Sequence, residues 1–388
     1  MVVQHNLQAM NSNRMLGVTT SSQAKVTEKL SSGYKINRAA DDAAGLSISE
    51  KMRKQIRGLD QASNNAQDGV SAVQTAEGAL AEVHDMLQRM NELAVQAANG
   101  TNSTSDRTAI QNEIDQLTTE IDRVAETTKF NETYLLKGGD STKTVTMKAH
   151  DAGLKGSLTV APNGKTATFK PAALDLSDKV MIGGKEYKIV ATADKDQNNG
   201  LIDTATAETL MKEELIKANS IGLDAPLAAD KVTGSRTAGF TITMGEQTVA
   251  NALSFNLHVG ADADMTNKIN VNIDTMNSAF LGVKGLDVVG TDGIGTQATY
   301  AIDAIADAIQ KVSDQRSALG AVQNRLEHTI KNLDNVVENT TAAESQIRDT
   351  DMASTMVEYT KNNILQQAGQ SMLAQANQST QGVLSLLG

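Results

Sequence analysis

The 388-residue sequence contains no cysteine and no tryptophan, and only 3% of its residues are aromatic. Without cysteine, disulfide bonds and thiolate metal sites are both excluded. With so few large rings, side-chain packing has to come from Ala, Leu, Val, Ile and Met, which are common in the seams between helices. The composition therefore favours an extended helical architecture over a compact one.

Proline is also scarce, and its positions divide the chain. All three prolines, Pro162, Pro171 and Pro226, lie in the middle, whereas residues 1–130 and about 296–388 contain none. Proline breaks helices, and long helices need partners that cover their apolar stripes. The sequence therefore predicts that the first and last segments pair as a long antiparallel coiled-coil rod, with the middle inserted as an outgrowth.

Neither a basic surface nor a long apolar run is present. The net charge is −11, and because residues 141–252 hold 13 Lys/Arg and 13 Asp/Glu, the acidic excess lies in the flanking segments. This charge distribution argues against nucleic-acid binding. No window approaches 18 apolar residues, and the N-terminus lacks a basic stretch followed by an apolar core. We expect no membrane insertion and no cleaved signal peptide, so the protein is soluble or exported by another route.

Apolar residues return at seven-residue intervals along the first half of the chain, as in a left-handed coiled coil. One set is Met52, Leu59, Ala66, Val73, Leu80, Leu87 and Ala94, and the second is Ala62, Gly69, Ala76, Val83, Met90 and Ala97. The pattern predicts a helix from about 44 to 99, roughly 80 Å long. Polar residues at 100–103 end it, and a second helix is predicted at about 104–128.

The same spacing recurs near the other end of the chain. Ile305, Val312, Leu319, Leu326 and Leu333 are seven residues apart, and we expect this helix to form one bundle with the two before it. Gln315 and Arg316 interrupt the seam, where a single polar break more often fixes register than serves chemistry.

The outermost segments have apolar stripes too wide for one partner. A helix is predicted at 351–387, with the N-terminal stretch as its partner, and both are expected to be largely disordered in a free monomer and to fold on assembly. The residues predicted to drive assembly are Val3, Leu7, Met10, Leu30, Ile364, Leu365, Ala368, Met372, Leu373, Val383, Leu384 and Leu387.

Between about 141 and 252 the apolar period changes towards two. Residues 143–150, 157–169 and 179–190 are predicted to form hairpins, and Asn163-Gly164 and Gly183-Gly184 suit tight turns. One helix is expected at about 206–220. A further hairpin is predicted at 253–276, packed against the helical rod. The fold class is thus mainly α, with an inserted α+β or β-rich outer domain.

Several segments at the two ends match a known family. They are Leu30-Ser-Ser-Gly33 with Ile36-Asn37 and Ala40-Asp-Asp-Ala-Ala-Gly45, then residues 58–80 and 87–103, and finally residues 343–354 and 363–388. In these segments the sequence resembles bacterial flagellin, over about 230 of its 388 residues. It departs from common flagellin patterns at Val3-Gln-His-Asn6, at Ser379-Thr380 and at Gly388. These departures bear on how strongly the protein would signal through the host receptor that recognises flagellins.

The resemblance implies a structural subunit of the bacterial flagellar filament, used for swimming motility. It implies a terminal domain 0 of residues 1–43 and 350–388, a domain 1 of residues 44–140 and 253–349, and a surface-exposed outer domain of residues 141–252. Heterologous contacts that do not close generate such a polymer. The implied partners are other copies, the flagellar export chaperone, the filament cap and hook-junction proteins, and the location is extracellular after type III export. The alternative is a hook–filament junction protein that shares the terminal helices.

The resemblance also implies recognition by Toll-like receptor 5. Recognised flagellins carry a Gln-Arg pair and a nearby Leu on the long helix and a Glu on the second, which match Gln88, Arg89, Leu93 and Glu113 here. Arg89 is suited to bidentate hydrogen bonds at such an interface. From the residues alone, a charged side chain beside a helix seam is usually a solvated or intersubunit contact.

Catalysis was the main hypothesis from another class, since some flagellins carry a metallopeptidase. Its zinc site needs His-Glu-x-x-His, and none of the five histidines, His5, His84, His150, His258 and His328, starts that motif. Asp194, Asp196 and Asn198 begin like a calcium loop, but the required Gly and bidentate Glu are absent. We therefore expect no enzyme activity and no cofactor.

Overall fold

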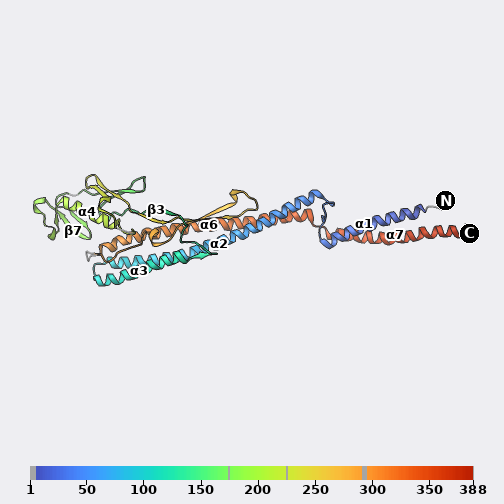
Figure 1. Cartoon of the computed structure of the whole chain (residues 1–388), viewed down its shortest axis with the longest axis horizontal. Helices are drawn as coiled ribbons and strands as arrows, with labels where there is room; N and C mark the ends of the chain where they lie inside the picture. Colours follow the sequence, from blue (N-terminus) through green and yellow to red (C-terminus); the bar gives the residue numbers. More distant parts are fainter. Residues whose placement is uncertain (1–5, 174, 224–225, 291–294, 388) are drawn as a thin grey trace. The chain divides into compact units, whose positions relative to one another are not determined.

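The computed structural model describes residues 6–173, 175–223, 226–290 and 295–387, and of residues 379–387 it describes the backbone only. Most of the described chain is helical (Figure 1). The helices are α1 (Leu7–Ser32), α2 (Ala43–Ala98), α3 (Thr104–Thr127), α4 (Thr204–Ala218), α5 (Ser278–Leu281), α6 (Thr296–Arg348) and α7 (Met352–Leu387). Short 3-10 turns are η1 (Thr192–Asp194), η2 (Gln197–Asn199), η3 (Ala229–Lys231) and η4 (Met265–Asn267). The predicted helices at 44–99, 104–128, 206–220 and 351–387 are confirmed to within two residues at each end.

The strands lie between α3 and α6 and form small sheets. They are β1 (Lys129–Phe130), β2 (Thr133–Tyr134), β3 (Thr142–Thr146), β4 (Gly156–Val160), β5 (Thr166–Pro171), β6 (Lys179–Ile182), β7 (Lys185–Ile189), β8 (Leu201–Ile202), β9 (Val232–Ser235), β10 (Gly239–Thr243), β11 (Glu246–Ala250), β12 (Leu253–His258) and β13 (Lys268–Ile273). The sheet orders are β1-β2, β4-β5-β10-β9, β11-β3, β12-β13 and β6-β7-β8. β7 and β8 pair in parallel, whereas the pairs β1–β2, β4–β5, β5–β10, β10–β9, β11–β3 and β6–β7 are antiparallel. The predicted mainly helical fold with a strand-rich middle is confirmed.

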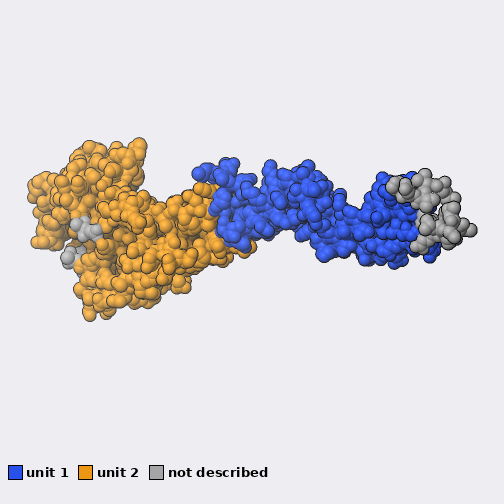
Figure 2. Space-filling view, turned by 45° about the vertical axis from the view of Figure 1, so that its right-hand side comes forward, with its two compact units in different colours: residues 1–65, 258–267, 329–388 blue, residues 66–257, 268–328 orange. Residues whose placement is uncertain are grey.

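The chain divides into two compact units (Figure 2). Unit 1 contains residues 1–65, 258–267 and 329–388, and unit 2 contains residues 66–257 and 268–328. Each unit therefore combines segments from both halves of the sequence. The three-domain division expected from the family resemblance stays a prediction.

The main core of unit 2 lies between α2, α3 and α6. The members of both seven-residue sets from Val73 and Ala76 onward enter it, because one face of the helix carries them. The side chains of this core on the three helices include Val73, Ala76, Leu80, Val83, Leu87, Met90, Ile110, Ile114, Ile121, Ile305, Val312 and Leu319. The predicted three-helix bundle is thus confirmed in this part of the chain.

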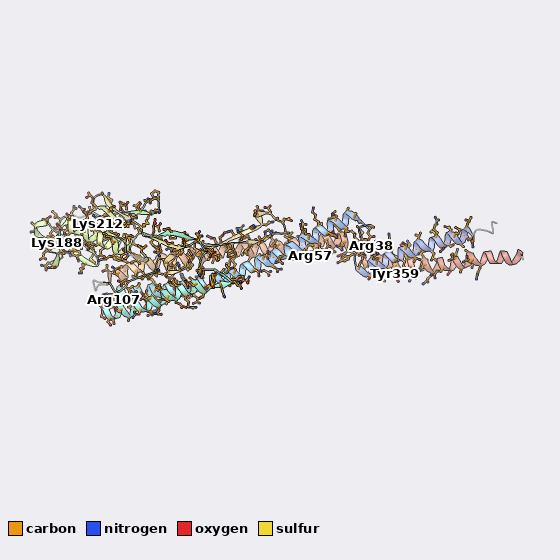
Figure 3. All side chains as sticks on the ribbon, viewed as in Figure 1. Arg38, Arg57, Arg107, Lys188, Lys212 and Tyr359 are labelled. Atoms are coloured by element: carbon orange, nitrogen blue, oxygen red, sulfur yellow. The ribbon has the colours of Figure 1, made fainter. Side chains whose placement is uncertain are left out.

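The turn from α2 to α3 is closed by charged and polar side chains. Ser103 and Asp106 form a capping box, in which each side chain binds the other residue's backbone N–H at 3.2 and 3.0 Å. Arg107 is fully buried, and its guanidinium donates to the carbonyl of Ala97 at 2.9 Å and to that of Asn99 at 3.3 Å. These carbonyls lie at the C-terminus of α2, where helix carbonyls lack partners of their own. Arg107 therefore ties α3 to the end of α2 (Figure 3).

The hairpin β12–β13 packs against the helices, as predicted. Leu253, Phe255 and Leu257 contact the helical core, and Val271 and Ile273 belong to it. Gln315 of α6 donates to the carbonyl of Asn272 at 3.1 Å. The polar interruption predicted to fix register therefore binds the backbone of this hairpin.

The strand-rich middle has its own core, formed by the sheets and α4. Its buried residues include Phe169, Ile189, Ile202, Leu215, Phe240 and Ile242. Hairpins β4–β5 and β6–β7 turn at Asn163-Gly164 and Gly183-Gly184, as predicted. The prediction that residues 143–150 form a local hairpin was wrong. β3 pairs instead with β11, about a hundred residues later, because its alternation marks a strand but not its partner.

Candidate assembly and receptor surfaces

In unit 1, α1 and α7 lie side by side and run antiparallel (Figure 1). Asn6 donates to the carbonyl of Ala376 at 3.1 Å, and Asn362 donates to the hydroxyl of Ser22 at 3.2 Å. Among the described side chains of the two helices, those that are buried are Val26, Thr355, Asn362 and Ala376. The two helices thus touch along a narrow seam.

The rest of their apolar surface is open. Leu7 is 70% exposed and Ile364 is 62% exposed. Met356, Val357, Ile364 and Leu365 line an open groove of about 540 Å³ along α7. Burial of apolar surface is the main driving force for protein association. An exposed stripe of this kind indicates an interaction site.

Six of the eight predicted assembly residues whose side chains are described lie exposed on this surface. The exposed ones are Leu7, Met10, Ile364, Leu365, Ala368 and Met372, and Leu30 and Leu373 are half-buried. Val3 lies outside the described residues, and the side chains of Val383, Leu384 and Leu387 do too. The sequence reasoning did not select Met15, Val18, Met352 and Val357, which are exposed on the same helices.

The predicted disorder of these ends in a free monomer stays a prediction. The structure has both segments as helices, with α1 capped by Asn6 at one end and Gly33 at the other. Gly33 has a φ of 76°, the left-handed conformation that glycine adopts without strain. The helices therefore have local stop and start signals but few buried contacts.

The segments that follow α1 and precede α7 pair with each other. Lys35 donates its backbone N–H to Arg348 at 2.7 Å, and Thr350 donates to Gly33 at 3.0 Å. The Arg348 guanidinium lies 4.7 Å from the centre of the Tyr34 ring, a cation–π contact. One short antiparallel bridge, between Tyr34 and Asp349, thus joins the chain at the end of α1 to the chain at the start of α7.

The residues matched to the receptor motif lie on α2 and α3. The Arg89 guanidinium donates to Glu113 at 2.9 Å and to Glu92 at 3.1 Å, and all three side chains are exposed. The hydrogen bond to Glu113, followed by that to Glu92, raises the pKa of Arg89. Gln88 contacts His84 on the same helix at 2.9 Å. The structure thus pairs Arg89 with Glu113 across α2 and α3, and Gln88 is an exposed neighbour of Arg89 in the sequence.

Leu93 occupies a different position from the other three. Its side chain is 2% exposed and belongs to the core between the helices. Leu93 cannot contact a receptor at the surface in this conformation, because neighbouring side chains of the same chain cover it. Leu93 instead packs α2 into the core between the helices.

Sites for chemistry are sparse in the part of the chain that the structure describes. No group of three or more His, Cys, Asp or Glu side chains there is arranged to hold a metal ion. The carboxylate of Asp196 accepts from Asn198 and Asn199 within its own turn. No described helix is long and apolar enough to cross a membrane.

Comparison with known proteins gives strong and consistent matches. Residues 3–141 match the bacterial flagellin N-terminal helical region, and residues 302–387 match the bacterial flagellin C-terminal helical region. A flagellin of Clostridium tyrobutyricum is 45% identical, covering 98% of this chain and 100% of that one. A flagellin of Halalkalibacterium halodurans is 40% identical, with full coverage of both.

A more distant likeness exists among solved structures. Flagellar hook-associated protein 3 of Legionella pneumophila is 15% identical, with a TM-score of 0.42, covering 77% of this chain and 98% of that one. Similarity at this level carries no functional information.

Proposed function

The chain belongs to the bacterial flagellin family, and from that premise we propose that it polymerises into the flagellar filament through the surface of α1 and α7. The observation that carries this proposal is the exposed apolar stripe of the helix pair, where Leu7, Ile364 and Leu365 are 70%, 62% and 46% exposed among the described residues. Each 100 Å² of apolar surface covered by neighbouring copies contributes about 2.5 kcal/mol. A helical filament results when such contacts repeat without closing.

The proposed assembly assigns a role to each part of the chain. Residues 1–43 and 350–388 act as domain 0, residues 44–140 and 253–349 act as domain 1, and residues 141–252 form the outer domain on the filament surface. The subunit is exported through the flagellar type III channel. Its further partners are the export chaperone, the filament cap and the hook-junction proteins.

Polymerisation of purified full-length protein tests the proposal. Ile364→Asn together with Leu365→Asn should raise the critical concentration by about tenfold or more, because polar side chains weaken apolar burial. Val160→Asn is the matched control, since Val160 is 52% exposed on β4 of the outer domain. Sedimentation after seeding, with electron microscopy of the pellet, gives the readout.

Equal polymerisation of the α7 variant and the control would contradict the proposal. Short closed complexes from the wild-type chain, in place of filaments that lengthen with time, would favour the junction-protein alternative. Filaments formed by a chain that lacks residues 1–43 and 351–388 would also remove α1 and α7 as the driving elements.

We further propose that Gln88, Arg89 and Glu113 form a binding surface for Toll-like receptor 5. The ion pair between Arg89 and Glu113 supports this, because it holds the guanidinium in a fixed position on the exposed face of α2 and α3. A preoriented guanidinium loses less freedom when it binds a partner.

Receptor binding by the soluble full-length protein tests this second proposal. Arg89→Ala should weaken binding by about tenfold or more, as expected for a central arginine. Arg123→Ala is the control, since Arg123 is also exposed and paired with a glutamate, Glu120, on α3. Circular dichroism checks that both variants remain folded. Equal affinity of the two variants for the receptor would overturn the proposal.

A further inference from the structure

Twelve of the 15 methionines fall into two populations, and of the other three, Met52 and Met86 are half-buried and Met1 lies outside the described residues. One population is buried in the cores of unit 2, as expected for an apolar side chain. It comprises Met90, Met147, Met211, Met244 and Met276. The other is exposed and comprises Met10, Met15, Met181, Met265, Met352, Met356 and Met372. The chain has no cysteine, so methionine supplies all of its sulfur, and these seven are the exposed methionines among the described residues.

Five of the seven exposed methionines lie on α1 and α7. Their exposed fractions run from 49% to 63%, for Met10, Met15, Met352, Met356 and Met372. Met356 lines the apolar groove of α7 beside Ile364 and Leu365. Met10 lies at the same level of the antiparallel pair as Met372, because Asn6 bonds to Ala376 and Ser22 to Asn362. The thioethers are therefore part of the surface proposed to be covered in the filament.

A thioether reacts with peroxides by a balanced two-electron step. The sulfur attacks one peroxide oxygen, the O–O bond breaks, a sulfur–oxygen bond forms, and the peroxide is reduced to water or an alcohol. The product sulfoxide is polar and chiral, and a reductase can reverse the reaction. The reaction requires access to sulfur, so exposed methionines react before buried ones.

We propose that the five methionines of α1 and α7 are an oxidation site that controls assembly. Peroxide converts them to sulfoxides in the unassembled subunit, and the oxidised subunit polymerises poorly. The reason is that assembly then buries sulfoxide oxygens among apolar side chains such as Ile364 and Leu365, without hydrogen-bond partners. In the filament these sulfur atoms are covered and react slowly. This inference rests on the proposed role of α1 and α7 in polymerisation.

The chain offers its own control. Met181 on β6 and Met265 on η4 are as exposed as the other five but lie outside α1 and α7. If oxidation weakens polymerisation through α1 and α7, oxidation of Met181 and Met265 alone should leave polymerisation unchanged. Leucine is the suitable replacement throughout, since it resists oxidation and matches methionine in volume and polarity.

The experiment compares three full-length proteins: wild type, a variant with all five α1 and α7 methionines changed to leucine, and Met181→Leu with Met265→Leu. Each is treated as monomer with hydrogen peroxide, quenched with free methionine and polymerised from seeds. Mass spectrometry locates the sulfoxides. After oxidation, the critical concentration of the wild type and of the double variant should rise by about fivefold or more, whereas that of the five-site variant should not change.

Two results would overturn the inference. One is oxidised α1 and α7 methionines in the wild type with an unchanged critical concentration. The other is equal loss of polymerisation in the five-site variant, which would place the damage elsewhere. If the five-site variant fails to polymerise before oxidation, reduction of oxidised wild type by both methionine sulfoxide reductases decides the matter. Recovery supports the inference, and no recovery after complete reduction contradicts it.

The experiments also distinguish an error in the proposed role of α1 and α7 in polymerisation from an error in the oxidation inference. If untreated wild type does not polymerise, or if the Ile364 and Leu365 variant polymerises normally, the role of α1 and α7 itself is wrong. The oxidation inference fails alone when untreated protein depends on this surface but oxidised protein assembles as well as before. Oxidation of formed filaments adds an independent readout, since Met181 and Met265 should then react faster than Met356 and Met372.

Discussion

The helical core of unit 2 and the α1–α7 pair of unit 1 are built from similar apolar residues, but these residues are buried in unit 2 and mostly exposed in the α1–α7 pair. Both contain long helices with regularly placed Leu, Ile, Val and Met side chains. In unit 2 these side chains are covered by α2, α3, α6 and the β12–β13 hairpin, and Leu80, Leu87 and Ile114 are fully buried. In α1 and α7 most of them face outward. An apolar helix face therefore stabilises the monomer only where the same chain supplies its cover, and elsewhere it is available to another copy.

The largest expected effect comes from removing one side chain on each side of this comparison. Leu87→Ala should lower the free energy of unfolding of the monomer by about 3 kcal/mol, because it leaves a cavity in a packed core. Ile364→Ala should change it by less than about 0.5 kcal/mol, as for other exposed sites. Urea unfolding followed by circular dichroism measures both. Comparable losses in the two variants would mean that α7 is packed in the monomer as firmly as α2.

The difference between the two regions also explains what the sequence could predict. The seven-residue repeat is local, so the bounds of α2 and the burial of Val73, Leu80 and Leu87 followed from it directly. The same kind of pattern marked Leu7 and Ile364 as apolar but could not tell whether the chain itself covers them. That distinction depends on how many partners a helix has, which is a property of the tertiary structure.

Two further features were not predictable for related reasons. The pairing of β3 with β11 joins residues about a hundred positions apart, and alternation alone does not identify a distant partner. Arg107 near the start of a polar helix resembles a surface residue, yet it is buried against carbonyls of α2. Only the fold of the α2–α3 turn creates its partners.

The second test compares the buried Arg107 with the exposed Arg123, because the two should contribute differently to the free energy of unfolding. Arg107→Met should lower the free energy of unfolding by about 2 kcal/mol, since the carbonyls of Ala97 and Asn99 lose a buried donor. Arg123→Met, which breaks an exposed pair with Glu120, should have an effect within about 0.5 kcal/mol. Thermal and urea unfolding give the comparison. An equally small effect at Arg107 would show that this contact is dispensable to the turn.

The smallest expected effect concerns the cap of α3. The hydrogen bonds from the Ser103 hydroxyl and backbone N–H lower the pKa of Asp106 below its ordinary value of 3.8. Because the folded pKa is depressed, the ionised carboxylate stabilises the fold above the unfolded value, and that contribution is lost as the pH falls through the folded pKa. The difference in stability between wild type and Asp106→Asn should be constant at neutral pH and shrink below about pH 4.

Unfolding curves of both proteins between pH 7 and pH 2 measure this difference. A gap that stays constant down to pH 2 would mean that the charge of Asp106 does not contribute to the cap. Ser103→Ala is the companion variant, and it should weaken the cap by about 1 kcal/mol at neutral pH.

Amide hydrogen exchange of the monomer and the filament tests the central comparison most directly, because it reports local opening along each helix. We expect α2, α3 and the first half of α6 to be protected in both states. We expect α1 and α7 to exchange rapidly in the monomer and to become protected in the filament. Protection of α1 and α7 in the monomer equal to that of α2 would contradict the account, as would rapid exchange of the same helices after assembly.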